Sequence, residues 1–524
     1  MKKLAILLAL VLALSCVTAL ADPIVEEKVT FSFMIDDSYT AEDHAIIYDM
    51  LEEQTNVHVD LILYPYQTAL EKMSVALSTG NYPDVIGGWL LGNKDILDLG
   101  VGQGTFLPLE ELIEEYCPNI SAVLEIPGVR DSMTCPDGHI YSIPYVVAEP
   151  EATYKPYINQ IWLENVNMEM PTTPEELKDV LIAFRDNDAN GNGDPTDEIG
   201  FSGDPNNLNL GMLAGWFGID GFGAGDYPFF TLVDGKLVFA ANTDAYRAFL
   251  EYFADLYAEG LVDPEIFTQD LETWKGKGKQ DLYGVSIAYG PGDFIDDYKK
   301  DTEPELYAKY GQNRFCAMPV LAGCENPVFH RNSYGVTLFR TQMVITDKCD
   351  EEKAAIILQW FDNLYVEENS VQSQSGKIGV SIEKLGEGLY RELDKSGWTE
   401  EFETANSWGY IFTQSAPRWY HDSVVLGFGK EEPEPSFNDI CDDLYRPFLG
   451  ETFKQVWATN EDDIARSSIL TTDINKYCKE MIAKFVSGET ELTDESWTAY
   501  CDQLNTYGLD ELYEINCRTL GIDE

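Results

Sequence analysis

Basic residues are scarce in this 524-residue sequence: 35 Lys and Arg stand against 91 Asp and Glu, giving a formal net charge of −56. A surface of this sign repels the phosphates of nucleic acids and of anionic lipids, so neither is expected as a partner. Only five histidines are present, and the H-E-x-x-H, G-x-S-x-G and P-loop motifs are all missing. The sequence therefore offers no positive signal for a hydrolase.

Long apolar runs are missing after the first 21 residues. Those residues, MKKLAILLALVLALSCVTALA, contain two lysines, an apolar run over residues 4–14 and then Ala19-Leu20-Ala21. The run is too short to span a bilayer and ends in small residues, which predicts a secretory signal peptide cleaved after Ala21. The alternative is a lipid anchor at Cys16, although Ala13 stands where a lipoprotein signal usually has a larger aliphatic residue. Loss of the two lysines would take the charge to −58.

Cysteine motifs are also missing, because the ten cysteines form no C-x-x-C and no Cys/His zinc pattern. Removal of Cys16 with the signal would leave nine, so at least one thiol stays unpaired within a monomer. Two local pairs could close disulfides, Cys117 with Cys135 and Cys316 with Cys324. A mixture of buried free thiols is the alternative.

Alternating and helical apolar patterns follow one another at the start of the mature chain. Residues 29–35 and 57–63 alternate apolar with polar side chains, as half-buried strands do. Residues 41–54 and 69–77 carry apolar side chains at helical spacing, and 82–88 form a short apolar run closed by glycines. Strand, helix, strand, helix, strand predicts a parallel sheet with helices on its faces.

A break with three prolines lies within residues 141–160 and predicts a crossing between lobes. Beyond it, Thr173 can cap a helix, Pro174 suits the first turn and Glu176 would complete a capping box. Leu177, Val180, Leu181 and Phe184 would form the buried stripe of this helix. A second amphipathic helix is predicted over 244–260, and helices dominate towards the C-terminus.

The stretch DNDANGNGDPTDEIG (residues 186–200) follows the first of these helices. Side-chain oxygens at every second position with glycines between them suit Ca²⁺, which takes six to eight oxygen ligands. Two registers fit the spacing. The first uses Asp186, Asp188 and Asn190 and ends at Asp197, whereas the second begins at Asp188. An Asn/Gly/Asp-rich turn without metal is the third reading.

Six segments in the same order resemble the bacterial extracellular solute-binding proteins of ABC importers, specifically the large, sugar-associated LplA-like branch. They are LSTGNYPDVIGG (77–88), FLPLEELIEEYCPNI (106–120), PDGHIYSIPYV (136–146), residues 162–200, LYAEGLVDPEIFTQD (256–270) and residues 473–515. The resemblance covers nearly the whole mature chain. It implies an α/β, two-lobe, periplasmic-binding-protein-like (type II) fold with an interlobe ligand cleft.

The resemblance also implies a division of the chain into lobes. Lobe 1 is expected to comprise residues 22–145 and about 325–375. Lobe 2 is expected to comprise 146–324 and about 376–524, and to carry the calcium loop 188–198. Nine mature cysteines and a degraded lipoprotein signal depart from the family pattern, which puts membrane attachment in doubt but not the fold.

The second register of the acidic loop looks like the calcium loop of sugar-binding members of this family. Its predicted ligands are Asp188, Asn190, Asn192, the carbonyl of Asp194, and Asp197 or Glu198. Pro195 argues against a helix after the loop, so a paired EF-hand sensor is not expected. We expect a structural Ca²⁺ that braces the loop against the helix end without touching ligand.

Aromatic residues beside glycine or proline in predicted loops are the candidate sugar contacts, because sugar C–H faces stack on aromatic rings. Core packing is the alternative for each of them. The candidate ligand-binding residues are Trp89, Trp216, Tyr289, Trp408, Arg418 and Trp419.

The sequence thus predicts a monomeric, non-enzymatic protein outside the cytoplasmic membrane that captures a carbohydrate, in particular an oligosaccharide, for an ABC permease. A secreted glycoside hydrolase with two catalytic carboxylates is the competing class. The same carrier fold with a peptide or another polar solute is the second alternative.

Overall fold

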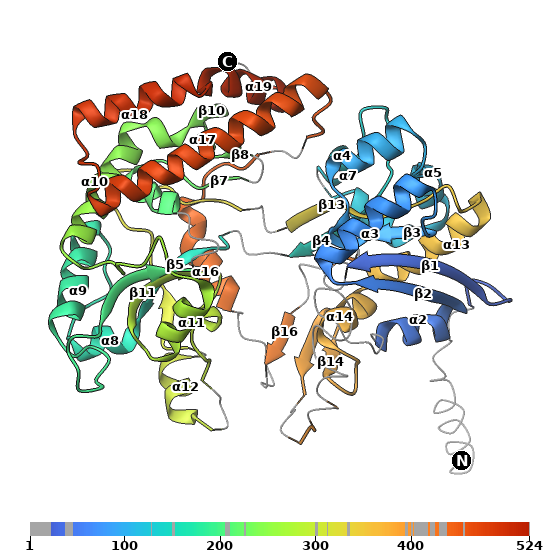
Figure 1. Ribbon diagram of the computed structural model, residues 1–524. Coiled ribbons are helices and arrows are strands. Elements are labelled where there is room, and N and C mark those ends of the chain that lie inside the picture. Colours follow the sequence, from blue (N-terminus) through green and yellow to red (C-terminus); the bar gives the residue numbers. More distant parts are fainter. Residues whose placement is uncertain are drawn as a thin grey trace, which may run out of the picture. The chain divides into compact units, whose positions relative to one another are not determined.

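The computed structural model describes residues 23–522, except 37–45, 127, 149–151, 205–209, 225–226, 299–301, 312, 333–335, 394–396, 400–401, 403–417, 420–424, 429–436 and 454–455. The predicted signal peptide, Cys16 and Trp408 lie outside the described residues. The chain forms two compact units (Figure 1). Unit 1 comprises Met1–Ala148 and Thr337–Glu434, and unit 2 comprises Glu149–Val336 and Pro435–Glu524.

A five-stranded sheet in the order β2-β1-β3-β13-β4 forms the centre of unit 1. Its strands are β1 (Val29–Asp36), β2 (Val57–Tyr64), β3 (Val85–Gly87), β4 (Ile143–Ala148) and β13 (Val336–Ile345). β1 runs parallel to both β2 and β3, whereas β13 is antiparallel to β3. Phe31, Phe33 and Ile35 of β1 are fully buried, as the alternation predicts. The predicted strand–helix–strand–helix–strand start is confirmed.

Helices connect and cover the strands of unit 1. They are α2 (Ile46–Thr55), α3 (Tyr66–Thr79), α4 (Asn93–Asp95), α5 (Glu110–Tyr116), α6 (Pro118–Leu124), α7 (Val129–Met133), α13 (Glu351–Asp362) and α14 (Glu367–Ser375). A small sheet of β14 (Ile382–Gly386), β15 (Leu389–Glu392) and β16 (Val425–Phe428) completes the unit.

Unit 2 is built on a four-stranded sheet in the order β12-β5-β11-β6. Its strands are β5 (Lys155–Asn159), β6 (Ile199–Gly203), β11 (Tyr283–Ala288) and β12 (Phe315–Ala317). β11 is parallel to β6 and antiparallel to β5. Two small hairpins pair β7 (Gly223–Ala224) with β8 (Tyr227–Pro228) and β9 (Phe230–Val233) with β10 (Lys236–Phe239).

Helices surround the sheet of unit 2 (Figure 1). They are α8 (Gln160–Asn165), α9 (Pro174–Asp186), α10 (Asp244–Ala258), α11 (Leu271–Lys279), α12 (Pro304–Tyr310), α16 (Phe437–Tyr445), α17 (Glu461–Ser487), α18 (Asp494–Thr506) and α19 (Leu509–Leu520). α17 packs against α10 and α19, and α19 against β10. A large hydrophobic core joins α9, α10, α17, α18 and α19 to the sheet, and a second, smaller cluster packs Trp274 of α11 and Cys441 of α16 against it.

The two amphipathic helices predicted for this unit are present. The Thr173 hydroxyl accepts a hydrogen bond from the Glu176 N–H at 3.2 Å and caps α9. Glu176 does not close the predicted capping box, because its Oε2 accepts instead from the backbone N–H and hydroxyl of Thr172, at 2.8 and 2.7 Å. In α10, Phe249 and Phe253 are fully buried, as their spacing indicates.

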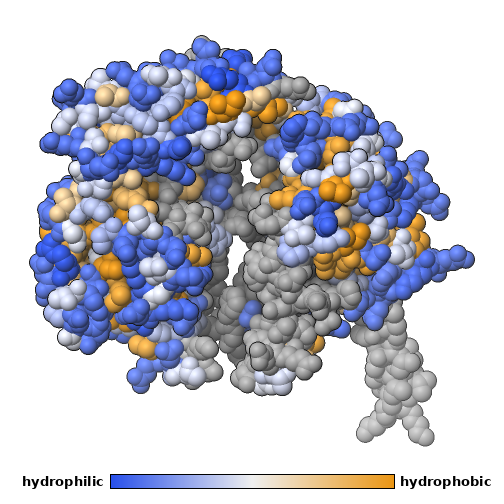
Figure 2. Space-filling model, in the orientation of Figure 1, coloured by the Kyte–Doolittle hydropathy of each residue, from blue (hydrophilic) through white to orange (hydrophobic). Residues whose placement is uncertain are grey.

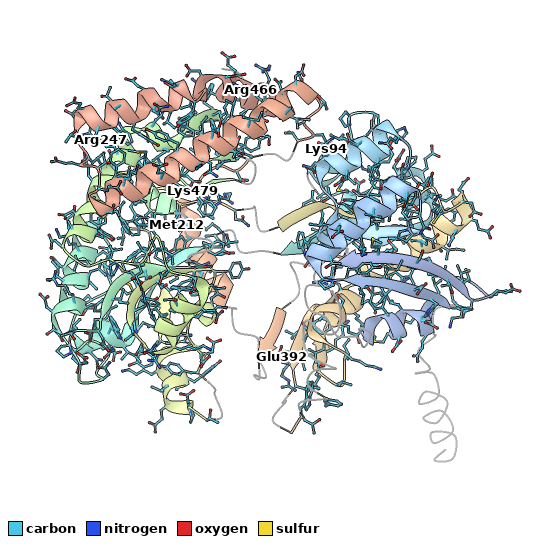
Figure 3. The ribbon with its side chains drawn as sticks, viewed as in Figure 1. Lys94, Met212, Arg247, Glu392, Arg466 and Lys479 are labelled. Carbon is cyan, nitrogen blue, oxygen red and sulfur yellow. The ribbon has the colours of Figure 1, made fainter. Side chains whose placement is uncertain are left out.

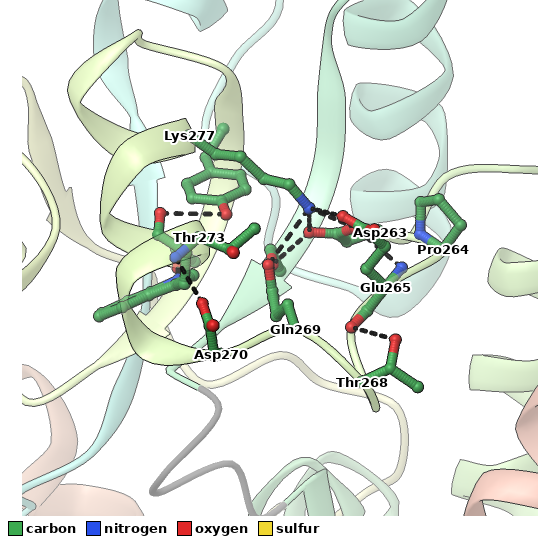
Figure 4. A network of polar contacts seen from close by, with 12 residues as sticks. Asp263, Pro264, Glu265, Thr268, Gln269, Asp270, Thr273 and Lys277 are labelled. Carbon is green, nitrogen blue, oxygen red and sulfur yellow. Dashed lines mark hydrogen bonds and ion pairs between the residues drawn. The ribbon is translucent and has the colours of Figure 1, made fainter.

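A buried polar network holds α11 against the sheet of unit 2 (Figure 4). The Lys277 ammonium donates to the Asp263 carboxylate at 2.9 and 3.1 Å and to the Gln269 side chain at 3.2 Å. Asp263 is fully buried and also accepts from the Ser202 hydroxyl at 3.0 Å. A buried carboxylate is thus matched by a cation and by a hydroxyl from β6.

The unit boundaries differ from the predicted lobes in three segments. Residues 146–148 were expected in the second lobe and about 325–336 in the first, but they belong to unit 1 and unit 2 respectively. Residues 376–434 were expected in the second lobe, but the contacts place them in unit 1. β14 and β15 are held there by α14, because the Tyr390 hydroxyl donates to Glu367 at 2.8 Å and Lys384 pairs with Glu368 at 2.7 Å. A signal was available in the sequence, since Pro433 and Pro435 lie where the chain returns to unit 2 at Pro435.

All nine cysteines of the described chain are free, so neither of the two candidate disulfides is formed. Six of the nine are buried. Among the described helices, none combines the length and the apolar character needed to cross a bilayer. Hydrophilic residues dominate the surface in view in Figure 2, with hydrophobic patches scattered between them, as the composition leads one to expect.

Candidate functional site

The acidic loop of unit 2 occupies residues 187–198, between α9 and β6. Side chains of the loop accept hydrogen bonds from its own backbone. Asp188 accepts from the Gly193 N–H at 3.0 Å. Asn192 accepts from the Asp194 N–H at 2.7 Å, and Asp194 from the Thr196 N–H at 3.2 Å. Gly193 has a φ of +94°, which a side chain would disfavour. The loop is therefore a defined, tightly turned structure.

Oxygen atoms converge inside this loop. Asp197 accepts from the side-chain amides of Asn190 at 3.1 Å and Asn192 at 2.8 Å, and Glu198 accepts from the Ala189 N–H at 2.9 Å. One oxygen each of Asp188 and Glu198, Oδ1 and Oε2, is buried without a hydrogen-bond partner. Burial raises the pKa of Glu198, with the nearby Asp197 adding to the effect. Buried carboxylate oxygens without donors fit a hard cation.

The two registers differ in the role of Asp186. This residue is exposed and its carboxylate pairs with the Arg185 guanidinium at 2.7 Å, so it is engaged outside the loop. Asp188, by contrast, is half-buried and points an oxygen into the loop. These contacts favour the second register.

No group of three or more His, Cys, Asp or Glu side chains is arranged to hold a metal within the described part of the chain. A cation in the acidic loop would therefore depend on Asn190, Asn192 and backbone oxygens as well as on carboxylates. Asn165 of α8 donates to the Ala189 carbonyl at 2.8 Å, which ties the loop to the neighbouring helix.

In unit 1, Trp89 lies two residues after the end of β3, at the edge where the parallel strands β1, β2 and β3 end. It is 37% exposed, and its backbone N–H donates to Asp36 at 2.8 Å. Asp36, the fully buried last residue of β1, was missed at the sequence level. Ligands of open α/β sheets bind outside the carboxyl ends of strands, so position at a strand end was the available signal.

Arg418 and Trp419 lie in a different setting from the one expected. Arg418 is only 1% exposed, and its guanidinium lies 5.0 Å from the centre of the Tyr145 ring and donates to the Tyr145 hydroxyl at 3.1 Å. Trp419 bridges to Val146 of β4, and its carbonyl accepts from the Ser370 hydroxyl. Both residues help to position β4 within unit 1.

In unit 2, Tyr289 directly follows β11 and is 37% exposed. Its ring meets that of Tyr154 edge-on, with centroids 6.0 Å apart, and its carbonyl accepts from the Tyr157 hydroxyl at 2.7 Å. Trp216, in contrast, is 1% exposed inside the core of unit 2, with no hydrogen-bond partner on its indole nitrogen. Trp216 therefore presents no surface to a ligand in this structure.

Three further residues lie at the same edge of unit 2 and were missed at the sequence level: Tyr154, Asp204 and Asp293. Asp204 follows β6, and Tyr154 precedes the antiparallel β5, so both lie where β11 ends. Burial raises the pKa of Tyr154, and the negative charges of Asp204 and Asp293 add to the shift. The two carboxylates thus disfavour ionisation of the Tyr154 hydroxyl.

Lys155 is the basic residue beside this edge. It is fully buried, and its ammonium donates to the carbonyls of Ala152 at 2.5 Å and Thr153 at 3.0 Å. Burial lowers its pKa. The ammonium is committed to backbone oxygens and is covered from solvent.

Two α/β units, each with a mixed sheet whose strand ends carry aromatic and acidic side chains, define a two-lobe, periplasmic-binding-protein-like fold. The chain belongs to the bacterial extracellular solute-binding protein family, whose model matches residues 37–318. Members of this family are binding proteins and not enzymes, in agreement with the prediction.

The chain is 28% identical over 520 residues to the fructooligosaccharide ABC transporter substrate-binding protein FusA of Streptococcus pneumoniae serotype 4 (strain ATCC BAA-334 / TIGR4), covering 94% of this chain and 90% of FusA. The solved structure of an EF-hand mutant of FusA in complex with fructo-nystose matches with a TM-score of 0.72 and 26% identity, over 93% of this chain and 97% of FusA. A further relative is the polygalacturonan/rhamnogalacturonan-binding protein YtcQ of Bacillus subtilis (strain 168), 26% identical over 31% of each chain.

Proposed function

We propose that this protein is the extracellular solute-binding component of an ABC importer and captures an oligosaccharide for the membrane permease. The observation that carries the proposal is the similarity to a fructooligosaccharide-binding protein over 94% of the chain. The exposed aromatic rings of Trp89 and Tyr289 at the strand ends support it, because sugar rings stack on such surfaces.

The mechanism we propose is an equilibrium between open and closed forms. A sugar would bind the closed form more tightly than the open form, so it would shift the population towards closure. Aromatic rings would supply the stacking surfaces. Carboxylates would accept hydrogen bonds from the sugar hydroxyls, and backbone N–H groups would donate hydrogen bonds to them. The membrane permease would recognise and bind the closed, sugar-bound form.

We further propose that the acidic loop holds one structural Ca²⁺ through Asp188, Asn190, Asn192, Asp194, Asp197 and Glu198. The buried, unpartnered oxygens of Asp188 and Glu198 support this assignment, and so does the EF-hand of FusA. The cation would supply positive charge to a loop whose carboxylates otherwise repel one another. It would brace the junction of α9 and β6.

A thermal-shift screen over oligosaccharides tests the function directly. A ligand that binds only the folded protein should raise the melting temperature with concentration. Analysis of the same mixtures for products tests the competing glycoside hydrolase, since turnover would support the hydrolase and stoichiometric binding without products supports the carrier. Protection by peptides alone would favour the second alternative, a carrier of another polar solute.

The N-terminus and the oligomeric state complete the proposal. We propose cleavage of the signal peptide after Ala21 and a monomer outside the cytoplasmic membrane. Mass spectrometry of the native protein should find Asp22 first, whereas a diacylglycerol-modified Cys16 would show that the protein is lipid-anchored. Light scattering should give the mass of one chain.

A further inference from the structure

The charged side chains at the edge of unit 2 where β6 and β11 end influence which kind of sugar can bind there. Relatives of this chain divide on that property, because fructooligosaccharides are neutral whereas polygalacturonan carries a carboxylate on each ring. Similarity therefore leaves the question open. The side chains at the end of β6 and β11 offer an independent observation.

The register of the sheet fixes which residues meet at this edge. Ile287 pairs with Gly203, so Tyr289 and Asp204 leave β11 and β6 on the same side. Ala288 pairs with Lys155, which brings Tyr154 to the same place. Asp293 is exposed in the turn that follows Tyr289 and accepts the Gly290 N–H at 3.0 Å. Two aromatic rings and two carboxylates thus share one edge.

The basic residue beside this edge, among those that the structure describes, is Lys155, and it is covered from solvent. Its ammonium is fully buried and held by the carbonyls of Ala152 and Thr153. The corresponding edge of unit 1 differs: β1 ends in Asp36, β2 in Tyr64, and Trp89 follows β3, but exposed lysines lie nearby. Lys72 lines a cavity with Tyr64, and Lys94 forms an exposed ion pair with Asp98, so the inference rests on unit 2.

Given the proposed carbohydrate function, on which this inference rests, we propose that the protein selects neutral oligosaccharides and rejects uronates. A sugar hydroxyl donates well to a carboxylate, and such charge-assisted hydrogen bonds are the strong ones. A uronate brings a carboxylate to an edge that already carries two and offers no exposed cation among its described residues. On binding, the carboxylate of the uronate would lose its hydration water without gaining a cation as a partner.

Matched trisaccharides that differ only in oxidation at C6 provide the test. We suggest isothermal titration of the full chain with α-1,4-galactotriose against trigalacturonate, β-1,4-mannotriose against trimannuronate, and 1-kestose as a further neutral probe. We expect neutral sugars alone to bind, or uronates to bind at least roughly tenfold more weakly, since like charges about 6 Å apart repel appreciably in a partly buried site. Added salt should narrow any measurable difference, because it screens repulsion.

A variant assigns the effect to this edge. Asp293→Asn removes one charge and keeps an oxygen for the Gly290 N–H, so it should reduce the preference for neutral sugars. The matched control is Asp179→Asn, which removes one charge from an exposed position on α9 of the same unit, and it should leave the preference unchanged. If both variants prefer neutral sugars over uronates by the same factor, the selectivity does not come from Asp293 and its edge.

The possible outcomes distinguish the proposed selectivity for neutral sugars from the proposed carbohydrate-binding function. A uronate that binds as tightly as the best neutral sugar would overturn the selectivity and leave the carbohydrate carrier intact. Absence of binding by every sugar, together with binding of a peptide or another solute, would overturn the proposed function and the inference with it.

Discussion

Unit 1 and unit 2 each contain a carboxylate paired with a lysine, and the two pairs are buried to different depths. In unit 1, Asp84 accepts from the backbone N–H and hydroxyl of Ser32 at 2.8 and 2.9 Å and pairs with Lys353 at 2.8 Å. In unit 2, Asp263 is fully buried, and its partner Lys277 is only 16% exposed and also contacts Glu265. Each carboxylate accepts from a serine hydroxyl, a backbone N–H and a lysine, but Asp84 is half-buried and Lys353 is 31% exposed, whereas the pair in unit 2 is more deeply buried.

The difference predicts where each unit is fragile. When a half-buried carboxylate loses its charge, the lysine left behind can still be solvated by water, so the cost is modest. A buried ion pair leaves an uncompensated charge when one partner is removed, which is far more costly. Unit 2 should therefore depend on single acidic residues more strongly than unit 1, and four predictions examine this comparison.

Removal of Asp263 should have the largest effect. Asp263→Ala leaves the Lys277 ammonium in a buried position without its main partner and removes the acceptor of the Ser202 hydroxyl. We expect unit 2 to lose about 3–5 kcal/mol in its free energy of unfolding. Chemical denaturation monitored by amide hydrogen exchange would locate the loss in α11, β6 and their neighbours.

The control for this prediction is Asp255→Ala on α10, which breaks an exposed pair with Lys178 in the same unit. It should cost less than about 1 kcal/mol. A similar loss in both variants would show that the buried network is no more important than a surface pair.

Removal of the metal should come next and should also be confined to unit 2. A cation bound at a hundred times its dissociation constant stabilises the folded state by about 3 kcal/mol. Chelator should lower the melting temperature accordingly, and exchange should rise around the end of α9 and the start of β6. Mg²⁺ should substitute poorly, because it requires a smaller octahedral shell. Sugar affinity should change only modestly.

Three variants distinguish the two registers of the loop. Asp188→Ala and Asn192→Ala should abolish Ca²⁺ binding, whereas Asp186→Ala should spare most of it because Asp186 pairs with Arg185. Loss of Ca²⁺ on Asp186→Ala but not on Asn192→Ala would establish the first register. Unchanged melting with chelator would mean a turn that holds no metal.

Local sequence patterns predicted the segments well but not the partners they find. Alternation in β1 and the Thr173 cap of α9 depend on neighbours along the chain, and both are present. Arg418, which looked like an exposed loop residue, is buried against Tyr145, 273 residues away. Asp36, Tyr154 and Asp204 were missed because periodicity does not reveal which strand ends lie together.

Glycine was an ambiguous signal for exposed tryptophans. Gly88 has a φ of +76° and turns the chain so that Trp89 emerges after β3. Gly215 precedes Trp216 for another reason, because a Cβ there would lie 2.0 Å from the Val328 carbonyl oxygen. The same dipeptide therefore marks a turn in unit 1 and close backbone packing in the core of unit 2. The sequence does not distinguish these cases.

Neutralisation of Asp84 should have a smaller effect than either change in unit 2. Burial opposes its ionisation, but Lys353 and Ser32 outweigh burial and hold the pKa of Asp84 below its ordinary value. A lowered folded-state pKa contributes stability that is present above the ordinary pKa and lost as pH falls through the folded value. Asp84→Asn should cost roughly 1–2 kcal/mol at neutral pH.

The pH dependence provides the check on this prediction. The wild-type protein should lose stability on acidification through the pKa of Asp84, and the difference between wild type and Asp84→Asn should shrink over the same range. Denaturation curves between neutral pH and about pH 3 would measure it. A difference that is constant with pH would show that the charge of Asp84 contributes nothing.

Exposed ion pairs should have the smallest effects, and they offer the sharpest like-for-like comparison between the units. Lys94 pairs with Asp98 in unit 1, and Arg466 of α17 pairs with Glu511 of α19 in unit 2 through two hydrogen bonds of 2.7 and 2.6 Å (Figure 3). Lys94→Ala should cost at most about 0.5 kcal/mol, since a local pair gains little in water. Arg466→Ala should cost more, up to about 1 kcal/mol, because the planar guanidinium joins two helices bidentately. Both effects should fade at high salt. Should either variant lose as much stability as Asp263→Ala, burial would not be what separates the charges of unit 2 from those of unit 1.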